Sequence, residues 1–465
     1  LSHSTHTFDG SGRSGQAATR EFYHSRQLTA IPQRGPLAAI TIPGAVDAWE
    51  EAHQRFGRLP WEQLLQPAIE LAEQGYPVSS SQSRWTQRDR DLLNQYPASR
   101  EVFLPNGQTP KIGSSIQNPD LARILRLIAA KGRSVFYQGE IAEIICTELA
   151  ELGGILTLED FAAHRSDWVD PIATQYRGYT VYELPPNTQG LAVLQILNLI
   201  EPFDLQQIGH DTPDYYHLIV EATKLAFADR DRWITDPTFV DIPVAELISK
   251  AYSDRRRARI SLTQAQTYQP GSIGGDTTHS ACVDNEGNAV SVIQSLYFDY
   301  GSGIAPKGLG FVLQNRGAFF SLDPNHINCL EPGKRTFHTL IPGLVLNRQG
   351  APYLVFGTMG GEGQPQTQLA LLTRVLDFGF DPQTAIDCPR WLWGRTWGDS
   401  ISGLTLEGRI SDSIRTELRH RGHTVHISPD WSEQMGHAHM IRIDPETHLL
   451  EGGCDPRSDG SALGF

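Results

Sequence analysis

Asp276-Thr277-Thr278-His279-Ser280-Ala281-Cys282-Val283 is the stretch that decides the fold. It is followed by Asp284-Asn285-Glu286-Gly287-Asn288 and then by Ala289-Val290-Ser291-Val292-Ile293-Gln294. Two runs rich in β-branched residues, joined by turn-forming residues, are typical of an antiparallel β-hairpin. A glycine-rich segment at 271–275 precedes the first run. The sequence therefore predicts a hairpin that begins at Thr278, directly after a turn.

Short strands and longer helices surround this hairpin in the sequence. Further strands are predicted at 179–183, 311–313, 340–346, 353–357, 404–406, 425–427 and 440–443, and helices at 45–56, 119–131, 216–233 and 366–376. Closely spaced strands with helices between them favour antiparallel sheets covered by helices, an α+β fold of the αββα sandwich type. No repeat, low-complexity linker or break in composition divides the chain, so we expect one layered domain.

Composition limits the classes of partner and cofactor. The chain has 465 residues and a net charge of −14, without a run of five basic residues, which argues against nucleic acid or an anionic membrane as a partner. No apolar stretch approaches the roughly 20 residues that span a bilayer. The five cysteines lack metal-site or disulfide spacing, and we predict no metal and no cofactor. His420, His423 and His426 have a metal-like spacing but straddle Gly422, so a metal site is not predicted there.

The location in the cell follows less directly from the sequence. The chain begins at Leu1 without a methionine, so we expect an upstream segment that is missing or removed. A cytoplasmic location is favoured, with the periplasm or secretion as alternatives, because a leader would have stood in that segment.

Thr277 is a candidate nucleophile. A hydroxyl group needs a neighbouring base, and a threonine at a new N-terminus carries one in its own α-amine. Ser295, on the second run of the hairpin, is placed to support that hydroxyl. In Gly357-Thr358-Met359-Gly360-Gly361-Glu362-Gly363, between a strand and a helix, N–H groups can converge on an oxyanion. The alternatives are that Thr277 is an ordinary residue at the start of a strand and that the glycines form a tight turn.

Several ordered motifs resemble the γ-glutamyltransferase (γ-glutamyltranspeptidase) family of N-terminal-nucleophile hydrolases. They are Pro185-Pro186-Asn187-Thr188-Gln189-Gly190, Glu221 to Asp231, Thr277-Thr278-His279, Asp284 to Val290, Pro332-Gly333-Lys334-Arg335, Gly360-Gly361 and Asp455 to Gly460. The resemblance covers nearly the whole chain. It implies the αββα fold and an enzyme made as a precursor.

The resemblance also implies a mechanism. Thr277 attacks the carbonyl of Asp276, and hydrolysis of the resulting ester releases a large subunit (1–276, expected to lack its first segment) and a small subunit (277–465), intertwined in one domain. His279 belongs to the same processing motif. The mature Thr277 then forms an acyl-enzyme with an amide, while the N–H groups of Gly360 and Gly361 hold the oxyanion.

The residues expected to bind the acyl donor depart from the family pattern. Tyr297, Arg316 and Phe319 replace the asparagine, glutamine and aspartate that grip the donor's α-amino group, and His338 and Thr339 replace two serines that hold its carboxylate. The family's clamping arginine has no unshifted counterpart, although Arg13 lies close. An arginine repels an ammonium group. We therefore expect an acylase-like branch whose donor ends in a carboxylate without an α-amino group, anchored by Arg316 or Arg13.

These inferences leave more than one function open. The favoured function is an autoprocessing γ-glutamyltransferase-like enzyme that passes γ-glutamyl or related acyl groups to water, an amino acid or a peptide. The alternatives are a glutaryl- or cephalosporin-acylase-like amidohydrolase and an unprocessed, non-catalytic scaffold of the same fold. For Arg316, the alternative to anchoring the donor is that it is a surface or structural arginine. A homo-oligomer stays open.

Overall fold

The predicted hairpin consists of strands β7 (Asp276–Val283) and β8 (Ala289–Tyr297) in the computed structural model. Its turn is closed by the Asp284 N–H, which donates to the Asn288 carbonyl at 3.0 Å. The Asp284 carboxylate accepts from the N–H groups of Glu286 and Asn288, each at 2.9 Å. Gly287 in the turn has φ +81°, a value that favours glycine. The structure describes residues 4–266, 276–394 and 403–465.

The described residues divide into two compact units, and the chain crosses between them several times. One unit comprises 1–7, 170–295 and 337–465, here called the sheet unit, and the other comprises 8–169 and 296–336, here called the helical unit. Repeated crossing explains why no single linker marks a boundary in the sequence. Each unit contains residues from both sides of the predicted cleavage point at Asp276–Thr277, and the division into two subunits stays a prediction.

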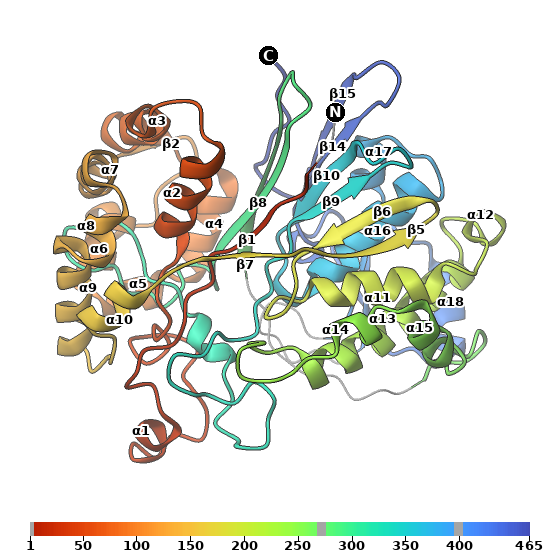
Figure 1. The fold of residues 1–465 in the computed structure, drawn as a ribbon, viewed down its shortest axis with the longest axis horizontal. Coiled ribbons are helices and arrows are strands. Elements are labelled where there is room, and N and C mark those ends of the chain that lie inside the picture. Colours follow the sequence, from red (N-terminus) through yellow and green to blue (C-terminus); the bar gives the residue numbers. More distant parts are fainter. Residues whose placement is uncertain (1–3, 267–275, 395–402) are drawn as a thin grey trace. The chain divides into compact units, whose positions relative to one another are not determined.

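A sheet in the order β15-β14-β10-β9-β6-β5 forms the centre of the sheet unit, with antiparallel pairing throughout the described strands. Its strands are β5 (Ile172–Tyr176), β6 (Tyr179–Glu183), β9 (Gly343–Leu346), β10 (Pro352–Thr358), β14 (Ala438–Ile443) and β15 (Leu450–Cys454). Helices α11 (Gly190–Ile200) and α16 (Gln364–Leu376) pack against it, and α13 (Pro213–Trp233) packs against α11 (Figure 1).

The two faces of β10 explain how the layers stack. Side chains alternate across a strand, and Phe356 joins the buried core that the sheet shares with the helices. Gly357 faces the opposite way, toward the hairpin, where β7 packs on β10 and β14. Full burial of Leu194 in α11 and Leu371 in α16 shows that the helix-facing side is a closed apolar core. Helices, sheet and hairpin stack in the order predicted for the sandwich.

The other elements of the sheet unit pack around this core. They are α12 (Leu205–Ile208), α14 (Val244–Leu247), α15 (Lys250–Arg257), α17 (Pro382–Asp387), α18 (Asp412–His420), β11 (Trp391–Trp393), β12 (Leu404–Glu407) and β13 (Val425–Ser428). β11 pairs with β12 in antiparallel fashion, and β12 pairs with β13 in parallel.

The helical unit has its own apolar core. Its helices are α1 (Arg20–His24), α2 (Ala45–Phe56), α3 (Trp61–Gln74), α4 (Ser80–Arg88), α5 (Arg90–Gln95), α6 (Pro97–Phe103), α7 (Pro119–Lys131), α8 (Arg133–Tyr137), α9 (Glu140–Glu151) and α10 (Leu158–Ala163). Its short strands are β2 (Tyr76–Pro77), which pairs with β3 (Ser115–Ile116), and β1 (Thr7–Asp9), which pairs with β4 (Asp167–Val169). Ile128, Phe136 and Ile145 belong to the buried cluster that these helices share.

Most predicted elements are confirmed. α2 has the predicted bounds, and the Asn118 side chain caps α7 by accepting from the Leu121 N–H at 3.0 Å. The strand predicted at 311–313 is wrong. Leu313 there exchanges backbone hydrogen bonds with Ser302 and Ile304 in a loop instead of joining a sheet. The predicted α+β class, with antiparallel sheets and helices, is confirmed. In the described parts of the chain, no helix combines the length and the apolar character needed to cross a bilayer.

Candidate active site

Thr277 lies at the start of β7, with 9% of its surface exposed. Its hydroxyl oxygen accepts a hydrogen bond from the Gln364 amide at 3.4 Å, and Gln364 is fully buried. Gln364 is the first residue of α16, so the predicted nucleophile faces the N-terminus of a helix, the end that favours negative charge. Sequence reasoning missed Gln364, because nothing near Thr277 in the sequence points to it.

Gly360 and Gly361 connect β10 to the short 3₁₀ turn that precedes α16. Their φ angles are +132° and +53°, which glycine adopts without the strain that a side chain would bring. In the described part of the chain, no hydrogen bond from either N–H group is found. The turn therefore offers two backbone donors beside the helix that carries Gln364. Their role as oxyanion donors stays a prediction, supported by this placement.

His279 attaches β7 to the central sheet. Its Nε2 atom lies 3.0 Å from the Ser291 hydroxyl, which donates to the Phe356 carbonyl at 3.2 Å. The ring covers Gly357, where an added Cβ would lie 2.3 Å from the His279 ring, and it stacks on His439. Because the Ser291 hydroxyl donates its proton to the Phe356 carbonyl, it accepts from His279, whose Nε2 atom is the donor.

Burial, aided by neighbouring His439, lowers the pKa of His279 to about 3. The ring is therefore neutral at physiological pH and holds the strand in place. Ser295 lies on the same face of β8 as Ser291, since side chains alternate along a strand. Thr277 and Ser295 are thus in one unit, on the two strands of one hairpin. Sequence reasoning missed Ser291, although Ser291, Ile293 and Ser295 stand at every second position and so share one face of the strand.

His338 and Thr339 lie beside the segment 187–189 of the sheet unit. The His338 N–H donates to the Asn187 carbonyl at 2.9 Å, and the Gln189 N–H donates to the His338 carbonyl at 3.1 Å. The Gln189 side-chain amide donates to the carbonyls of Thr339 and Gly361, each at 2.9 Å. The structure therefore brings two predicted donor-binding residues together with the glycine turn.

The other predicted donor-binding residues belong to the helical unit. Arg316 is 4% exposed, with its guanidinium carbon 5.4 Å from the Tyr297 ring centroid and 6.0 Å from that of Phe319. Burial, opposed by Tyr297, lowers the pKa of Arg316 to about 9. Arg316 is thus no surface arginine. Arg13 donates to the Gly333 carbonyl at 3.2 Å and is half-buried.

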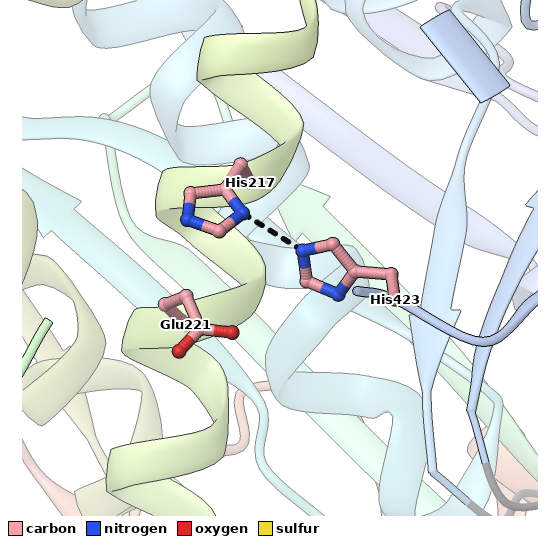
Figure 2. Close-up of side chains that lie close together, drawn as sticks. All are labelled: His217, Glu221 and His423. Carbon is pink, nitrogen blue, oxygen red and sulfur yellow. Dashed lines mark hydrogen bonds between the residues drawn. The ribbon is translucent and has the colours of Figure 1, made fainter. Parts of the chain in front are cut away.

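A buried cluster of metal-ligand types lies elsewhere in the sheet unit. His217 and Glu221 of α13 approach His423, and their potential ligand atoms lie within 4.8 Å of one another (Figure 2). His420 and His426, in contrast, are exposed. Only His423 of the three spaced histidines therefore takes part in this cluster, and its partners come from a distant helix.

Hydrogen bonds already occupy this cluster. His217 Nε2 donates to the Ser261 carbonyl at 2.7 Å, so its Nδ1 accepts from His423 Nε2 at 2.8 Å. Glu221 pairs with the Lys224 ammonium at 2.6 Å. A metal ion would have to break the imidazole pair and compete with Lys224 for Glu221. The arrangement fits an internal anchor for the chain after α15 better than it fits a metal centre.

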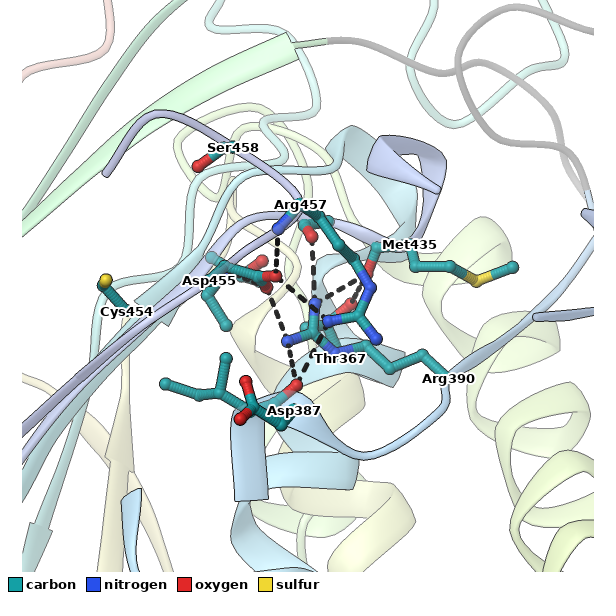
Figure 3. Close-up of polar contacts among 12 residues, drawn as sticks. Thr367, Asp387, Arg390, Met435, Cys454, Asp455, Arg457 and Ser458 are labelled. Carbon is teal, nitrogen blue, oxygen red and sulfur yellow. Dashed lines mark hydrogen bonds and ion pairs between the residues drawn. The ribbon is translucent and has the colours of Figure 1, made fainter. Parts of the chain in front are cut away.

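The tail motif forms a buried ion network. Asp455 contacts Arg390 at 2.6 Å and Arg457 at 3.0 Å (Figure 3). Arg457 also contacts Glu407 at 2.7 Å. Burial alone would raise the pKa of Asp455, but the two arginines lower it to about 2. Arg390 further donates to the Gly436 carbonyl at 2.9 Å. The Asp455–Arg457 pair is therefore structural.

This ion network reaches the glycine turn. An added Cβ on Gly360 would lie 3.4 Å from the Gly436 Cα, and the Met359 N–H donates to the His437 carbonyl at 3.1 Å. The Asp455 carboxylate accepts from the Ala438 N–H at 2.9 Å. Residues 436–438 are thus held on one side by ion pairs and on the other by the strand that leads into Gly360.

Comparisons with known proteins match this chain over nearly its whole length. The sequence model of the family described as Gamma-glutamyltranspeptidase matches residues 2–465. The Glutathione hydrolase-like YwrD proenzyme of Bacillus subtilis is 47% identical over 98% of this chain and 86% of its own length. The Oxamate amidohydrolase proenzyme of Klebsiella pneumoniae is 43% identical, again over 98% and 86%.

A solved structure agrees with the sequence matches. The cephalosporin acylase from Bacillus halodurans superimposes with a TM-score of 0.91 at 38% identity, covering 98% of this chain and 84% of that chain. The resemblance seen in the motifs and the predicted fold class are confirmed by these matches. So is the prediction of an enzyme with hydrolase or transferase chemistry.

Proposed function

This chain belongs to the γ-glutamyltranspeptidase family, and from that premise we propose that it is a self-cleaving precursor whose Thr277 becomes an N-terminal nucleophile for acyl transfer. The observation that carries the proposal is the Thr277 hydroxyl, which is buried at the start of β7 and faces Gln364 directly after the Gly360–Gly361 turn. A hydroxyl nucleophile and backbone N–H donors for the oxyanion are parts that amide cleavage uses, and the helix N-terminus favours the negative charge that develops.

Self-cleavage at the Asp276–Thr277 bond proceeds in two steps. The Thr277 hydroxyl attacks the Asp276 carbonyl, the amide nitrogen leaves as an amine, and an ester links the two residues. Water then hydrolyses this ester, giving a carboxylate on residues 1–276 and a free α-amine on residues 277–465. That amine acts as the base when Thr277 attacks the substrate amide, and water, an amino acid or a peptide accepts the acyl group.

A denaturing gel with mass spectrometry tests the proposal. We expect two fragments, with the smaller beginning at Thr277, and one uncut band for Thr277→Ala. A parent chain that stays uncut would favour a non-catalytic scaffold. A cut at another bond would remove Thr277 as the nucleophile.

A more specific donor is supported by Arg316. It is a buried cation beside Tyr297 and Phe319, and the aspartate of the family pattern is replaced by Phe319, which favours an acyl group that ends in a carboxylate without an α-amino group. The relative named for oxamate fits this view, because oxamate carries a carboxylate and no α-amino group. The similarity to a cephalosporin acylase points the same way. Glutathione-type γ-glutamyl amides are the competing donors.

Two chromogenic substrates separate these donors. Glutaryl and γ-glutamyl p-nitroanilide differ only in the α-amino group, and we expect a higher kcat/KM for the glutaryl compound. Arg316→Gln should lower kcat/KM for glutaryl about tenfold or more and affect the γ-glutamyl compound less. Arg13→Gln serves as the parallel variant for the other anchor. A clear preference of the parent enzyme for the γ-glutamyl substrate would refute the carboxylate-anchor proposal.

A further inference from the structure

We propose that Gln189 is a positioning residue that holds the Gly360–Gly361 turn and the His338–Thr339 segment in one fixed arrangement. This inference rests on the proposed function, since it assigns a task to Gln189 in turnover by Thr277. Gln189 is fully buried at the N-terminal end of α11, and it lies in the motif Pro185 to Gly190.

The side chain of Gln189 bridges two segments that are far apart in the sequence. Its Nε2 atom donates to the carbonyls of Thr339 and Gly361, at 2.9 Å each. Thr339 is itself fully buried, so this contact is shielded from water. A primary amide has two N–H donors, and both are used. The contact fixes the peptide directly after Gly361 relative to the segment expected to meet the acyl donor.

Arg230 sets the orientation of this amide. Its Nη1 atom donates to Gln189 Oε1 at 3.2 Å, and Arg230 is 2% exposed. A guanidinium can only donate and a carbonyl can only accept, so the amide has one allowed orientation, with Nε2 toward Thr339 and Gly361. The Arg230 charge is balanced by Asp231 at 2.9 Å and by Glu362 at 3.9 Å.

Backbone contacts strengthen the same link. Thr188 and His338 form a parallel β-bridge, next to the hydrogen bonds that Asn187 and Gln189 make with His338. The segment 187–189 is therefore joined to 338–339 along its backbone, and the Gln189 side chain extends the connection to Gly361. Removing that side chain's amide should loosen the glycine turn and leave the backbone bridge in place.

This division of contacts predicts a specific kinetic effect. Donors preorganised around a developing oxyanion act in the transition state more than in substrate binding. We therefore expect Gln189→Met, which keeps an unbranched side chain of similar length, to lower kcat about tenfold or more while KM changes less than about threefold. The substrate for this measurement is whichever p-nitroanilide the parent enzyme cleaves.

Gln195→Met is the matched control. Gln195 lies on the same helix, is 2% exposed, and also donates its amide to two acceptors, the Leu247 carbonyl at 3.1 Å and Asp229 at 3.3 Å. Both variants remove one buried amide of the same kind, so their melting temperatures report the structural cost. A loss of kcat in Gln189→Met alone, at similar melting temperatures, supports the proposal.

Other outcomes would contradict the role proposed for Gln189. Parental kcat within about twofold in Gln189→Met would show that the bridge does not position the turn. Equal losses of activity in both variants would reduce Gln189 to a structural residue. An uncut Gln189→Met precursor that melts like the parent would move its role from turnover to processing. An uncut or inactive parent would instead count against the function proposed for Thr277.

Discussion

Glu183 ends strand β6 with a fully buried carboxyl group. No hydrogen-bond partner for either of its oxygen atoms is found within the described ranges, and burial raises its pKa well above the usual value. The folded protein keeps this proton, whereas the unfolded chain loses it above pH about 4.3. The free energy of unfolding contributed by Glu183 therefore falls as the pH rises above that value.

Two substitutions separate charge from polarity at this site. Glu183→Met should raise the free energy of unfolding by about 1–3 kcal/mol at pH 7, because it removes a buried polar group without a partner. Glu183→Gln should remove the pH dependence but keep the polar cost. Urea titrations at pH 5 and pH 8 measure both effects. A parent protein more stable than Glu183→Met at pH 8 would contradict this account.

Gly357 illustrates how one position supports the predicted nucleophile. A methyl group there would lie 2.3 Å from the His279 ring, which links β7 to Ser291 and the Phe356 carbonyl. Gly357→Ala should lower the free energy of unfolding by about 1–3 kcal/mol and slow self-cleavage, since β7 must shift. Gly464→Ala is the control, as nothing lies within 4 Å of its added Cβ. Equal melting temperatures for the two variants would show that His279 moves freely.

At the scale of elements, the ion network anchors β14 and the tail to the sheet unit. Asp455 and Arg390 have side chains 0% and 1% exposed, so removing one charge leaves the others uncompensated. Asp455→Asn should cost about 3–5 kcal/mol in the free energy of unfolding. Asp412→Asn, which changes an exposed carboxylate paired with Arg415, should lower it by about 0.5 kcal/mol or less. If the urea midpoints of the two variants differ little, a structural role for the network is refuted.

The elements that sequence periodicity predicted share a physical origin. Amphipathic helices such as α2 and α7, and the β7–β8 hairpin with its Asp-Asn-Glu-Gly-Asn turn, are encoded by neighbouring residues. The parallel pairing of β12 with β13 is not encoded locally, because it depends on α18 returning the chain to the same sheet. β5 and β15 at the sheet edges were not predicted either, although each pairs with its neighbour in the chain.

At the scale of the whole molecule, buried neutral histidines predict acid sensitivity. Burial lowers the pKa of His279 and His423 to about 3 and that of His437 to about 4. The unfolded chain takes up protons below pH about 6.5, whereas the folded protein does not, so stability falls as the pH drops through this window. Each histidine should cost at most about 2 kcal/mol at pH 5.

Thermal unfolding between pH 7.5 and pH 5 measures this effect. We expect the melting temperature to fall steadily below pH about 6.5 and the decline to weaken in His423→Gln, which removes one of the titrating groups. Urea midpoints at the same pH values give the free energies directly. A melting temperature that stays constant down to pH 5 would show that these rings are protonated in the folded protein.

The sequence by itself determined the family and the fold class and singled out Thr277, Gly360 and Gly361 as candidate site residues, because ordered motifs, periodicity and turn chemistry are properties of neighbouring residues. The tertiary structure alone decided which distant side chains meet them. Gln364 reaches Thr277, and Gln189 connects Thr339 to Gly361, only because α11, α16 and β7 pack on one sheet. Such contacts depend on packing across more than 80 residues of chain, which local patterns do not record.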